Sequence, residues 1–264
     1  MTIGRNIKGA YTIWYRDVIR FSRDRPRIIA ALAQPMLYLF VFGTGLGSAM
    51  SGSRAGAVDF RQFMFPGTLA MTVLFTAIFS AISIVWDREF GFLKEVMVAP
   101  VSRTAVALGK VAGGATVAMF QGVVALLLAP VVGVKLSIDQ IVSIVGLMLL
   151  LATVMTSFGI LIAARQKSME GFQMMMNFLL MPMFFLSGAF FPLRGVPPWM
   201  AWLATIDPVT YGVDSLRQVV LRRSVSADLL GALTVHPMAT NVFVMALLSV
   251  AFIIPAVWQF GRQD

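Results

Sequence analysis

The charged side chains with the most informative spacing lie in one segment between two uncharged runs of membrane length, residues 63–85 and 111–134. The segment carries acids and bases in alternation: Asp87, Arg88, Glu89, Lys94, Glu95, Arg103 and Lys110. Pro100 can end a first short helix there, and Ser102 can cap a second. Such side chains could form ion pairs and hydrogen bonds with a partner protein. A solvated loop with an ordinary interfacial helix is the alternative interpretation.

Groups for chemistry within the chain itself are sparse. Cysteine is absent, which excludes disulfides, thiolate nucleophiles and Cys-ligated zinc. His236 is the one histidine and stands beside Pro237, with no carboxylate cluster to complete a metal site. The pair Gly109-Lys110 ends like a phosphate-binding loop, but Thr104 replaces the first glycine of that motif. We therefore expect no enzyme activity, no metal and no cofactor on this chain.

The composition indicates a membrane protein. Of 264 residues, 58% are hydrophobic and 12% charged, and the mean hydropathy is +0.84. Soluble domains are about 45–50% apolar and about 25% charged. The net charge of +9 does not indicate nucleic acid, because the basic residues gather at the ends of apolar runs.

The uncharged runs predict an all-α membrane protein with a single transmembrane domain, residues 1–264. Each run is near or above the roughly 20 residues that a helix needs to cross a bilayer. The predicted six transmembrane helices cover residues 28–48, 63–86, 107–134, 139–164, 171–192 and 238–260. A cytoplasmic loop, residues 87–106, joins the second span to the third.

Residues 1–27 predict an amphipathic helix that lies in the membrane interface rather than crossing it. Tyr11 and Trp14 belong to an aromatic face, and Arg16 and Arg20 to a basic face. A plain positively charged leader is the alternative. With a cytoplasmic N-terminus, 14 of the 21 Lys and Arg residues lie inside, so both termini are expected in the cytoplasm.

Residues 196–222 predict a re-entrant helical hairpin between spans five and six, dipping into the membrane from outside. Two apolar stretches of half-membrane length meet at Asp207 and Pro208. Tyr211 lies on the second stretch, where Asp214 and Arg217 are one helical turn apart and could pair. Two helices lying flat on the outer surface are the alternative.

The uncharged runs that define these spans, such as residues 111–134 and 140–164, carry no ionisable side chain of the kind that proton-driven carriers need at membrane depth. The argument is weaker against sodium, which backbone and hydroxyl oxygens can bind. Energy for transport must then come from a partner at the cytoplasmic surface. The segment at residues 88–103 is the cytoplasmic loop with the most side chains that could contact such a partner.

Three motifs resemble the type-2 ABC exporter permeases. The first is Arg-Glu-Phe-Gly-Phe-Leu-Lys-Glu at residues 88–95, followed by Ala-Pro-Val-Ser-Arg at 99–103 and Gly-Lys at 109–110. The second is Phe-Leu-Ser-Gly-Ala-Phe-Phe-Pro-Leu at 185–193, and the third is Asp-Pro-Val-Thr-Tyr-Gly-Val-Asp-Ser-Leu-Arg at 207–217. The resemblance covers nearly the whole chain and is nearest to the drug-resistance permeases of the daunorubicin type. Phe92, Lys94 and Asp207 depart from the family pattern, which leaves the partner and the substrate open.

The resemblance implies a bacterial cytoplasmic-membrane exporter. Two permeases, either two copies or a paralogous pair, would bind two ATP-binding cassette subunits that carry ATP and Mg. The residues that would contact the ATPase are Arg88, Glu89, Gly91, Leu93, Glu95, Pro100, Ser102 and Arg103.

The resemblance also implies a path for a hydrophobic drug or lipid, lined by spans one, two and five and roofed by residues 196–222. Its expected lining is aromatic and Met-rich: Phe40, Phe75, Phe79, Met174, Asn177, Phe178, Met181, Phe184 and Phe185. Packing against lipid is the alternative for each of these residues. The alternative functions are export of a polysaccharide or sodium, or a membrane scaffold without transport.

Overall fold

The computed structural model describes residues 3–50, 59–89, 101–166 and 168–261. These residues form helices and no strand, in agreement with an all-α chain. The helices are α1 (Ile3–Arg23), α2 (Arg25–Met50), α3 (Phe60–Ser80), α4 (Ile82–Glu89), α6 (Arg103–Leu126), η1 (Ala129–Val132), α7 (Ile138–Ala163), α8 (Met169–Leu186), α9 (Pro198–Ile206), α10 (Pro208–Leu221), α11 (Ala227–Leu233) and α12 (Met238–Gly261).

Side-chain caps start several of these helices. The Ser102 hydroxyl accepts a hydrogen bond from the Ala105 amide, as predicted, and Ser168 and Ser226 cap α8 and α11 in the same way. The prediction was wrong about where two helices end. α6 ends at Leu126 rather than 134, and Pro130, which has no amide proton, lies in the short turn η1 that follows. α8 ends at Leu186, just before Gly188 adopts a left-handed φ of 78°.

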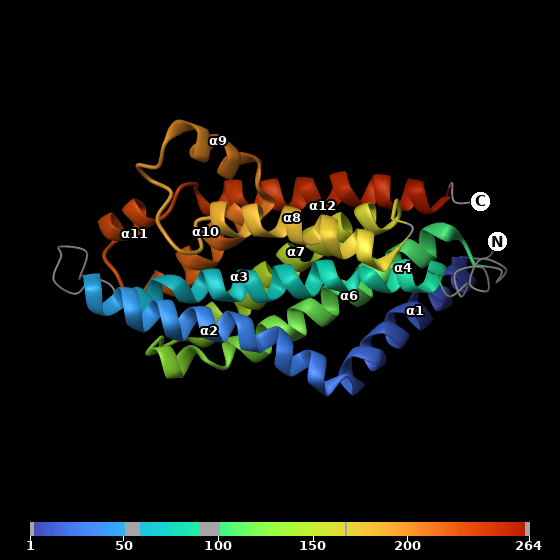
Figure 1. Cartoon of the computed structure of the whole chain (residues 1–264), viewed down its shortest axis with the longest axis horizontal. Helices are drawn as coiled ribbons and strands as arrows, with labels where there is room; N and C mark the ends of the chain where they lie inside the picture. The colour runs from blue at the N-terminus through green and yellow to red at the C-terminus, as the bar shows by residue number, and fades with distance from the viewer. Residues whose placement is uncertain (1–2, 51–58, 90–100, 167, 262–264) are drawn as a thin grey trace.

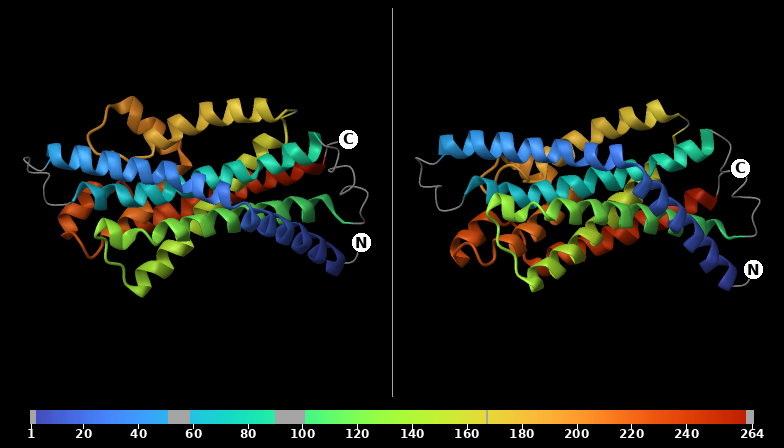
Figure 2. Two further views of the ribbon diagram at one scale, coloured as in Figure 1. Left: turned by 60° about the horizontal axis from the view of Figure 1, so that its bottom comes forward. Right: turned by 90° about the horizontal axis from the view of Figure 1, so that it is seen from below.

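The long helices form an elongated bundle in which α2, α3 with α4, α6, α7, α8 and α12 run in alternating directions (Figure 1). The start of α1, the end of α4, the start of α6 and the end of α12 lie at one end of the bundle. The helices α9, α10 and α11 lie at the opposite end (Figure 1). Figure 2 shows α1 slanting away from the bundle axis at the first of these ends.

The core of the bundle surrounds α3, which packs against α2, α6, α7 and α10. Phe65, Leu69, Val73 and Leu74 of α3 are at most 1% exposed. The second hairpin helix, α10, is buried along nearly its whole length, whereas α9 and one face of α8 are exposed. The helix α8 therefore lies at the edge of the bundle.

Among the described residues, four stretches are long and apolar enough to cross a membrane, judged by length and composition. They are Phe60–Glu89, Arg103–Leu126, Ile138–Ala163 and Ala227–Gln259. Two short helices, α9 and α10, flank Asp207 where the sequence indicated a break.

The predicted span at residues 63–86 is interrupted at Ala81, between α3 and α4. The Ser80 hydroxyl donates to the Ala77 carbonyl at 2.6 Å, a backbone contact that bends helices. A Cβ atom on Gly114 would collide with the Ser80 Oγ, and one on Gly159 would lie 3.1 Å from the Ala81 Cβ. Because they have no side chain, the two glycines allow α6 and α7 to pack closely against the chain at the break between α3 and α4.

Candidate functional site

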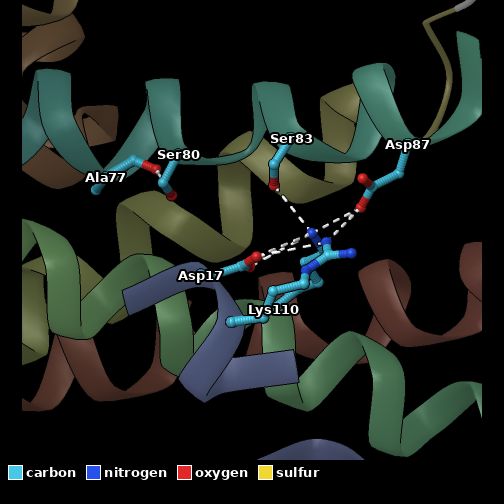
Figure 3. Close-up of polar contacts among 7 residues, drawn as sticks. Asp17, Ala77, Ser80, Ser83, Asp87 and Lys110 are labelled. Carbon is cyan, nitrogen blue, oxygen red and sulfur yellow. Dashed lines mark hydrogen bonds and ion pairs between the residues drawn. The ribbon is translucent and has the colours of Figure 1, made fainter. Parts of the chain in front are cut away.

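Four charged side chains meet where α1, α4 and α6 come together, and we call Arg16, Asp17, Asp87 and Lys110 the ionic junction (Figure 3). The Lys110 Nζ lies 2.9 Å from the Asp87 Oδ2 and 3.3 Å from the Asp17 Oδ2. It also donates to the Ser83 Oγ at 3.1 Å. The Arg16 Nη2 lies 2.9 Å from the same Asp87 oxygen. One carboxylate on α4 thus holds a cation from α1 and a cation from α6.

The ionic junction is largely removed from solvent. The Lys110 side chain is 4% exposed, and those of Asp87 and Asp17 are 10% and 13% exposed. Two cations and two anions cancel formally, which is the condition under which buried charges are tolerated. Because removing one member would leave an uncompensated buried charge, the junction strongly favours one arrangement of the three helices.

Close helix packing brings α1 to α6. A Cβ on Gly109 would lie 2.7 Å from the Ala10 carbonyl oxygen, and one on Gly113 would lie 3.2 Å from the Asp17 Cβ. Glycines four residues apart allow such close approach, so this pair serves the packing of α1 against α6. The Trp14 Nε1 donates to the Thr116 Oγ1 at 3.0 Å and adds a polar contact to the same interface.

The predicted aromatic face of α1 is present, since the centroid of the Tyr11 ring lies 5.4 Å from that of Trp14 and 6.0 Å from that of Tyr15. Tyr11 and Tyr15 are 59% and 50% exposed and their rings stack. Trp14 and Arg16, in contrast, turn toward α6 and α4. Arg20 lies over the Trp86 ring, with its Cζ 4.7 Å from the ring centroid. The helix therefore uses one face for the bundle and leaves the tyrosines on another.

The residues predicted to contact an ATPase are placed only in part. Gly91, Leu93, Glu95 and Pro100 lie outside the described residues. Ser102 caps α6, and its amide also donates to the Asn6 Oδ1 of α1 at 3.0 Å. Arg103 is the first residue of α6.

Arg88 and Glu89, at the end of α4, have different surroundings. Arg88 donates to the Gln166 carbonyl at 2.5 Å and to the Ala164 carbonyl at 3.0 Å. These carbonyls follow the C-terminus of α7, where a cation is favourable. Glu89 is exposed at the end of α4.

Several of the predicted path residues gather in an aromatic cluster formed by α2, α3 and the end of α8. The Phe184 ring contacts the rings of Phe75, Tyr38 and Phe190, with centroids 6.3, 6.1 and 4.8 Å apart. Phe79 stacks on Phe75, and Phe185 contacts Phe184. The remaining predicted path residues are exposed on the faces of α2 and α8: Phe40, Met174, Asn177, Phe178 and Met181.

At the opposite end of the bundle, the predicted hairpin residues carry out structural roles. Asp207 caps α10 by accepting from the Val209 amide at 2.9 Å, and Pro208 is the first residue of that helix. The Tyr211 hydroxyl donates to the Thr205 carbonyl at 2.7 Å, which ties α10 to α9. The Tyr211 ring stacks on His236, which gives the single histidine a packing role.

The predicted pairing of Asp214 with Arg217 was wrong, because each binds another part of the chain. Asp214 accepts from the Val235 and His236 amides, both at 3.0 Å, and from the Asn241 Nδ2 at 2.8 Å. Arg217 donates to the Gly188 carbonyl at 2.6 Å and lies over the Phe63 ring. The two side chains fasten the segments before and after the hairpin onto α10.

A partly open cavity of about 90 Å³ adjoins the ionic junction, between α1, α4 and α6. Its walls carry charged, hydroxyl and aromatic groups: Asp17, Arg20, Phe21, Asp24, Ser80, Ile82, Ser83, Trp86, Gly113, Gly114 and Val117. Figure 3 shows Ser80, Ser83 and Asp17 around this space. The described residues contain no group of three side chains that could hold a metal ion.

Sequence reasoning missed Asp17, Ser83 and Lys110 as members of one site. Lys110 was grouped with the charged segment that follows the second span, although it lies inside α6 and is buried. Two signals were available in the sequence. Asp17 is an acid within a strongly basic helix, and Lys110 directly follows a glycine of the packing pair.

Comparison with known proteins identifies the family. A family model described as ABC-2 type transporter matches residues 9–221. A putative transport permease ycf38 of Pyropia yezoensis is 29% identical over 76% of this chain and 70% of its own length. The inner membrane transport permease YadH of Escherichia coli K12 is 26% identical over 78% of this chain and 80% of its own. Nodulation protein J of Rhizobium leguminosarum bv. viciae is 26% identical over 81% of this chain and 83% of its own length. The chain therefore belongs to the ABC-2 type transporter family: it is a multi-pass membrane permease, and this membership implies association with an ABC ATPase partner.

Proposed function

We propose that this chain is the membrane subunit of an ATP-driven exporter that moves a hydrophobic or amphipathic drug or lipid outward across the bacterial cytoplasmic membrane. In this proposal α2, α3 with α4, α6, α7, α8 and α12 are the six spans. Both termini lie in the cytoplasm, and α9 with α10 forms the re-entrant hairpin on the outer side. The resemblance of the motifs supports placing the chain with the daunorubicin-type drug-resistance permeases in this proposal.

The observation that carries the proposal is the ionic junction. The helices α4 and α6 flank the segment at residues 90–102 that would receive the ATPase, and the junction ties both of them to α1. A push on that segment would therefore move three helices as one body. Arg88 extends the connection to the end of α7. Without such cross-links, movement at the cytoplasmic surface would be lost in the independent motion of single helices.

The proposed cargo follows from the surfaces of α2 and α8. The aromatic cluster around Phe184 borders an exposed apolar face with Phe178 and Met181, which are 78% and 49% exposed. Flexible Met and flat aromatic side chains accommodate apolar molecules of varied shape. A second permease, facing this surface, would enclose a path that suits amphipathic molecules better than a long glycan.

The test is reconstitution of the full chain in proteoliposomes with a candidate ABC ATPase. We expect the permease to stimulate ATP hydrolysis and to drive ATP-dependent movement of a fluorescent amphiphile. Stimulated hydrolysis with movement of a polysaccharide or of sodium instead would replace the cargo and keep the permease role. Absence of both complex formation and stimulation would favour a scaffold without transport.

A further inference from the structure

A second, larger cavity lies at the end of the bundle opposite the ionic junction, the end that carries α11 (Figure 1). Its volume of about 560 Å³ falls within the range of about 300–1,000 Å³ that small-molecule sites occupy. Its walls come from the start of α3, the segment between η1 and α7, the first turn of α7 and the residues that follow α10. The lining is mainly polar and includes the cations Lys135 and Arg223, which suits a charged group better than an apolar molecule.

Two glutamines hold the walls of this cavity together. The Gln62 Nε2 donates to the Gly133 carbonyl at 3.3 Å and ties α3 to the segment before α7. Gln140 is 2% exposed, and its Nε2 donates to the Val219 carbonyl of α10 at 2.7 Å. Its Oε1 accepts from the Ser137 amide at 3.1 Å and from the Ser137 hydroxyl at 2.8 Å. These hydrogen bonds fix the relative positions of α3, α7 and α10 around the cavity, so its shape is set before a ligand arrives.

The two cations of the cavity differ in their contacts. The Arg223 Nη2 lies 3.2 Å from the Asp139 Oδ1 and 3.3 Å from its Oδ2, so this carboxylate orients the guanidinium. The other guanidinium nitrogens of Arg223 meet no acceptor among the described residues. Lys135 is exposed and forms neither a hydrogen bond nor an ion pair within the part of the chain that the structure describes. An oriented arginine and a nearby ammonium group together match the oxygens of a phosphate.

The charge around the cavity favours an anionic ligand. The cations Lys135, Arg222 and Arg223 stand against the single carboxylate of Asp139, which Arg222 also attracts, so two positive charges remain. The other charged residues described at this end of the bundle cancel one another formally: Asp59, Arg61, Arg194 and Asp228. A ligand with a net negative charge is therefore attracted, whereas a zwitterion with no net charge gains less.

An exposed apolar stripe on α7 begins beside the cavity. Ile138, Val142 and Leu149 are 82%, 67% and 42% exposed, and their spacing places them on one face of the helix. In the proposed function the second permease faces α2 and α8, which leaves this face of α7 to lipid. Acyl chains attached to a headgroup in the cavity would lie along the stripe, whereas a soluble phosphate compound would gain nothing from it.

We propose that the cavity between α3, α7 and α10 binds the headgroup of an anionic phospholipid, with the phosphate oxygens at Lys135 and Arg223 and the acyl chains along the exposed stripe of α7. The bound headgroup would bridge the segment before α7 and the residues that follow α10. This inference rests on the proposed function for the lipid-facing side of α7 and for the orientation of the chain, which makes the leaflet the outer one.

The test measures binding to the purified full chain by native mass spectrometry. The probes are dioctanoyl phosphatidylglycerol, which is anionic, dioctanoyl phosphatidylcholine, which is zwitterionic, and the soluble headgroup compound glycerophosphoglycerol. We expect the glycerol lipid to bind at least about fivefold more tightly than the choline lipid, the effect of one basic residue on an anionic headgroup. Equal binding of the two lipids would overturn the site. Binding of glycerophosphoglycerol as tight as that of the glycerol lipid would overturn the assignment to a membrane lipid.

Variants locate the site on the chain. Lys135→Gln and Arg223→Gln should each weaken binding of the glycerol lipid about fivefold and leave the choline lipid unchanged. Asp139→Asn removes the neighbouring negative charge and should tighten the glycerol lipid, and weaker binding there would refute the charge argument for the site. Lys8→Gln, which replaces an exposed lysine of α1 at the opposite end of the bundle, is the matched control and should bind as the parent does.

The failure of this site and the failure of the permease function give different results. Unchanged lipid selectivity in both Lys135→Gln and Arg223→Gln would refute the lipid site, and ATP-driven export by the same preparations would leave the permease function standing. Selective binding of the glycerol lipid by a chain that neither binds nor stimulates an ATPase would do the reverse.

Discussion

The Lys110 Nζ and the Asp87 Oδ2 lie 2.9 Å apart, and the two residues lie on opposite sides of the segment that would receive an ATPase. This ion pair joins α4 to α6, the two helices on either side of that segment. The same Asp87 oxygen also accepts from Arg16, which brings α1 into the contact. The pair thus fixes the distance between α4 and α6 and makes that distance depend on α1.

Replacing Lys110 by methionine should destabilise the protein by on the order of 3–5 kcal/mol, because Asp17 and Asp87 would share the single cation of Arg16 in a buried setting. The measurement is unfolding of the purified chain by a denaturing detergent. Lys110→Met with Asp87→Asn should recover part of the loss. Lys135→Met, which removes an exposed lysine at the other end, should stay within about 0.5 kcal/mol of the parent. A double variant as unstable as the sum of the single variants would contradict the pairing.

Replacing Gly109 by alanine should push α1 away from α6. The new methyl group would lie 2.7 Å from the Ala10 carbonyl oxygen, a backbone atom that cannot rotate aside. We expect a loss of about 1–3 kcal/mol and faster tryptic cleavage within α1. Gly146→Ala is the control, since a Cβ there meets nothing within 4 Å, and it should be neutral or stabilising by up to about 1 kcal/mol. Equal effects of the two substitutions would argue against close packing of α1.

The helical bundle could be predicted from the sequence because long uncharged runs separated by charged residues are typical of membrane-spanning helices. The break at Ala81 could not be predicted. It depends on the Ser80 hydroxyl turning back to the Ala77 carbonyl, and on glycines of α6 and α7 that lie far away in the sequence. Local patterns in residues 63–86 contain neither of these glycines.

The ionic junction shows the same limit for the site. Asp17 and Lys110 are 93 residues apart, and each is an ordinary residue of a charged membrane flank when its own neighbours alone are considered. The two side chains meet only because α1 packs along α6. The glycines at 109 and 113 allow this packing, but their presence in the sequence does not predict it. The predicted pairing of Asp214 with Arg217 was wrong for a related reason. Helical spacing places the two residues near each other, but each side chain instead hydrogen-bonds to the backbone of a segment outside α10.

Substitutions of Arg88 and Glu89 should affect different properties: the first should lower the stability of the protein, and the second should lower the coupling of ATP hydrolysis to export. Arg88→Ala removes two charged hydrogen bonds to the end of α7 and should cost about 1.5–3 kcal/mol. Glu89→Ala alters an exposed side chain and should leave stability within about 0.5 kcal/mol. In proteoliposomes with the ATPase, we expect Glu89→Ala to hydrolyse ATP while export falls. Parental export by Glu89→Ala would remove this residue from the coupling role.

The orientation of the chain is testable because it has no native cysteine. Asp228 is exposed in α11 at one end of the bundle, and Thr12 is exposed in α1 at the other. In intact cells, a membrane-impermeant maleimide should label Asp228→Cys and should label Thr12→Cys only after the cells are opened. The reverse pattern would invert the proposed topology.

Asp214 should control the segment that leads into α12. Its carboxylate accepts hydrogen bonds from the amides of Val235 and His236, and asparagine would present an amide group with only one acceptor oxygen to the same donors. We expect Asp214→Asn to lower the stability by about 1–3 kcal/mol and to speed hydrogen exchange at those two amides. Asp228→Asn, an exposed acid of α11, is the control and should leave both amides protected. Unaltered exchange in Asp214→Asn would mean that the backbone of this segment is held by other contacts, and the role of α10 as its anchor would fall.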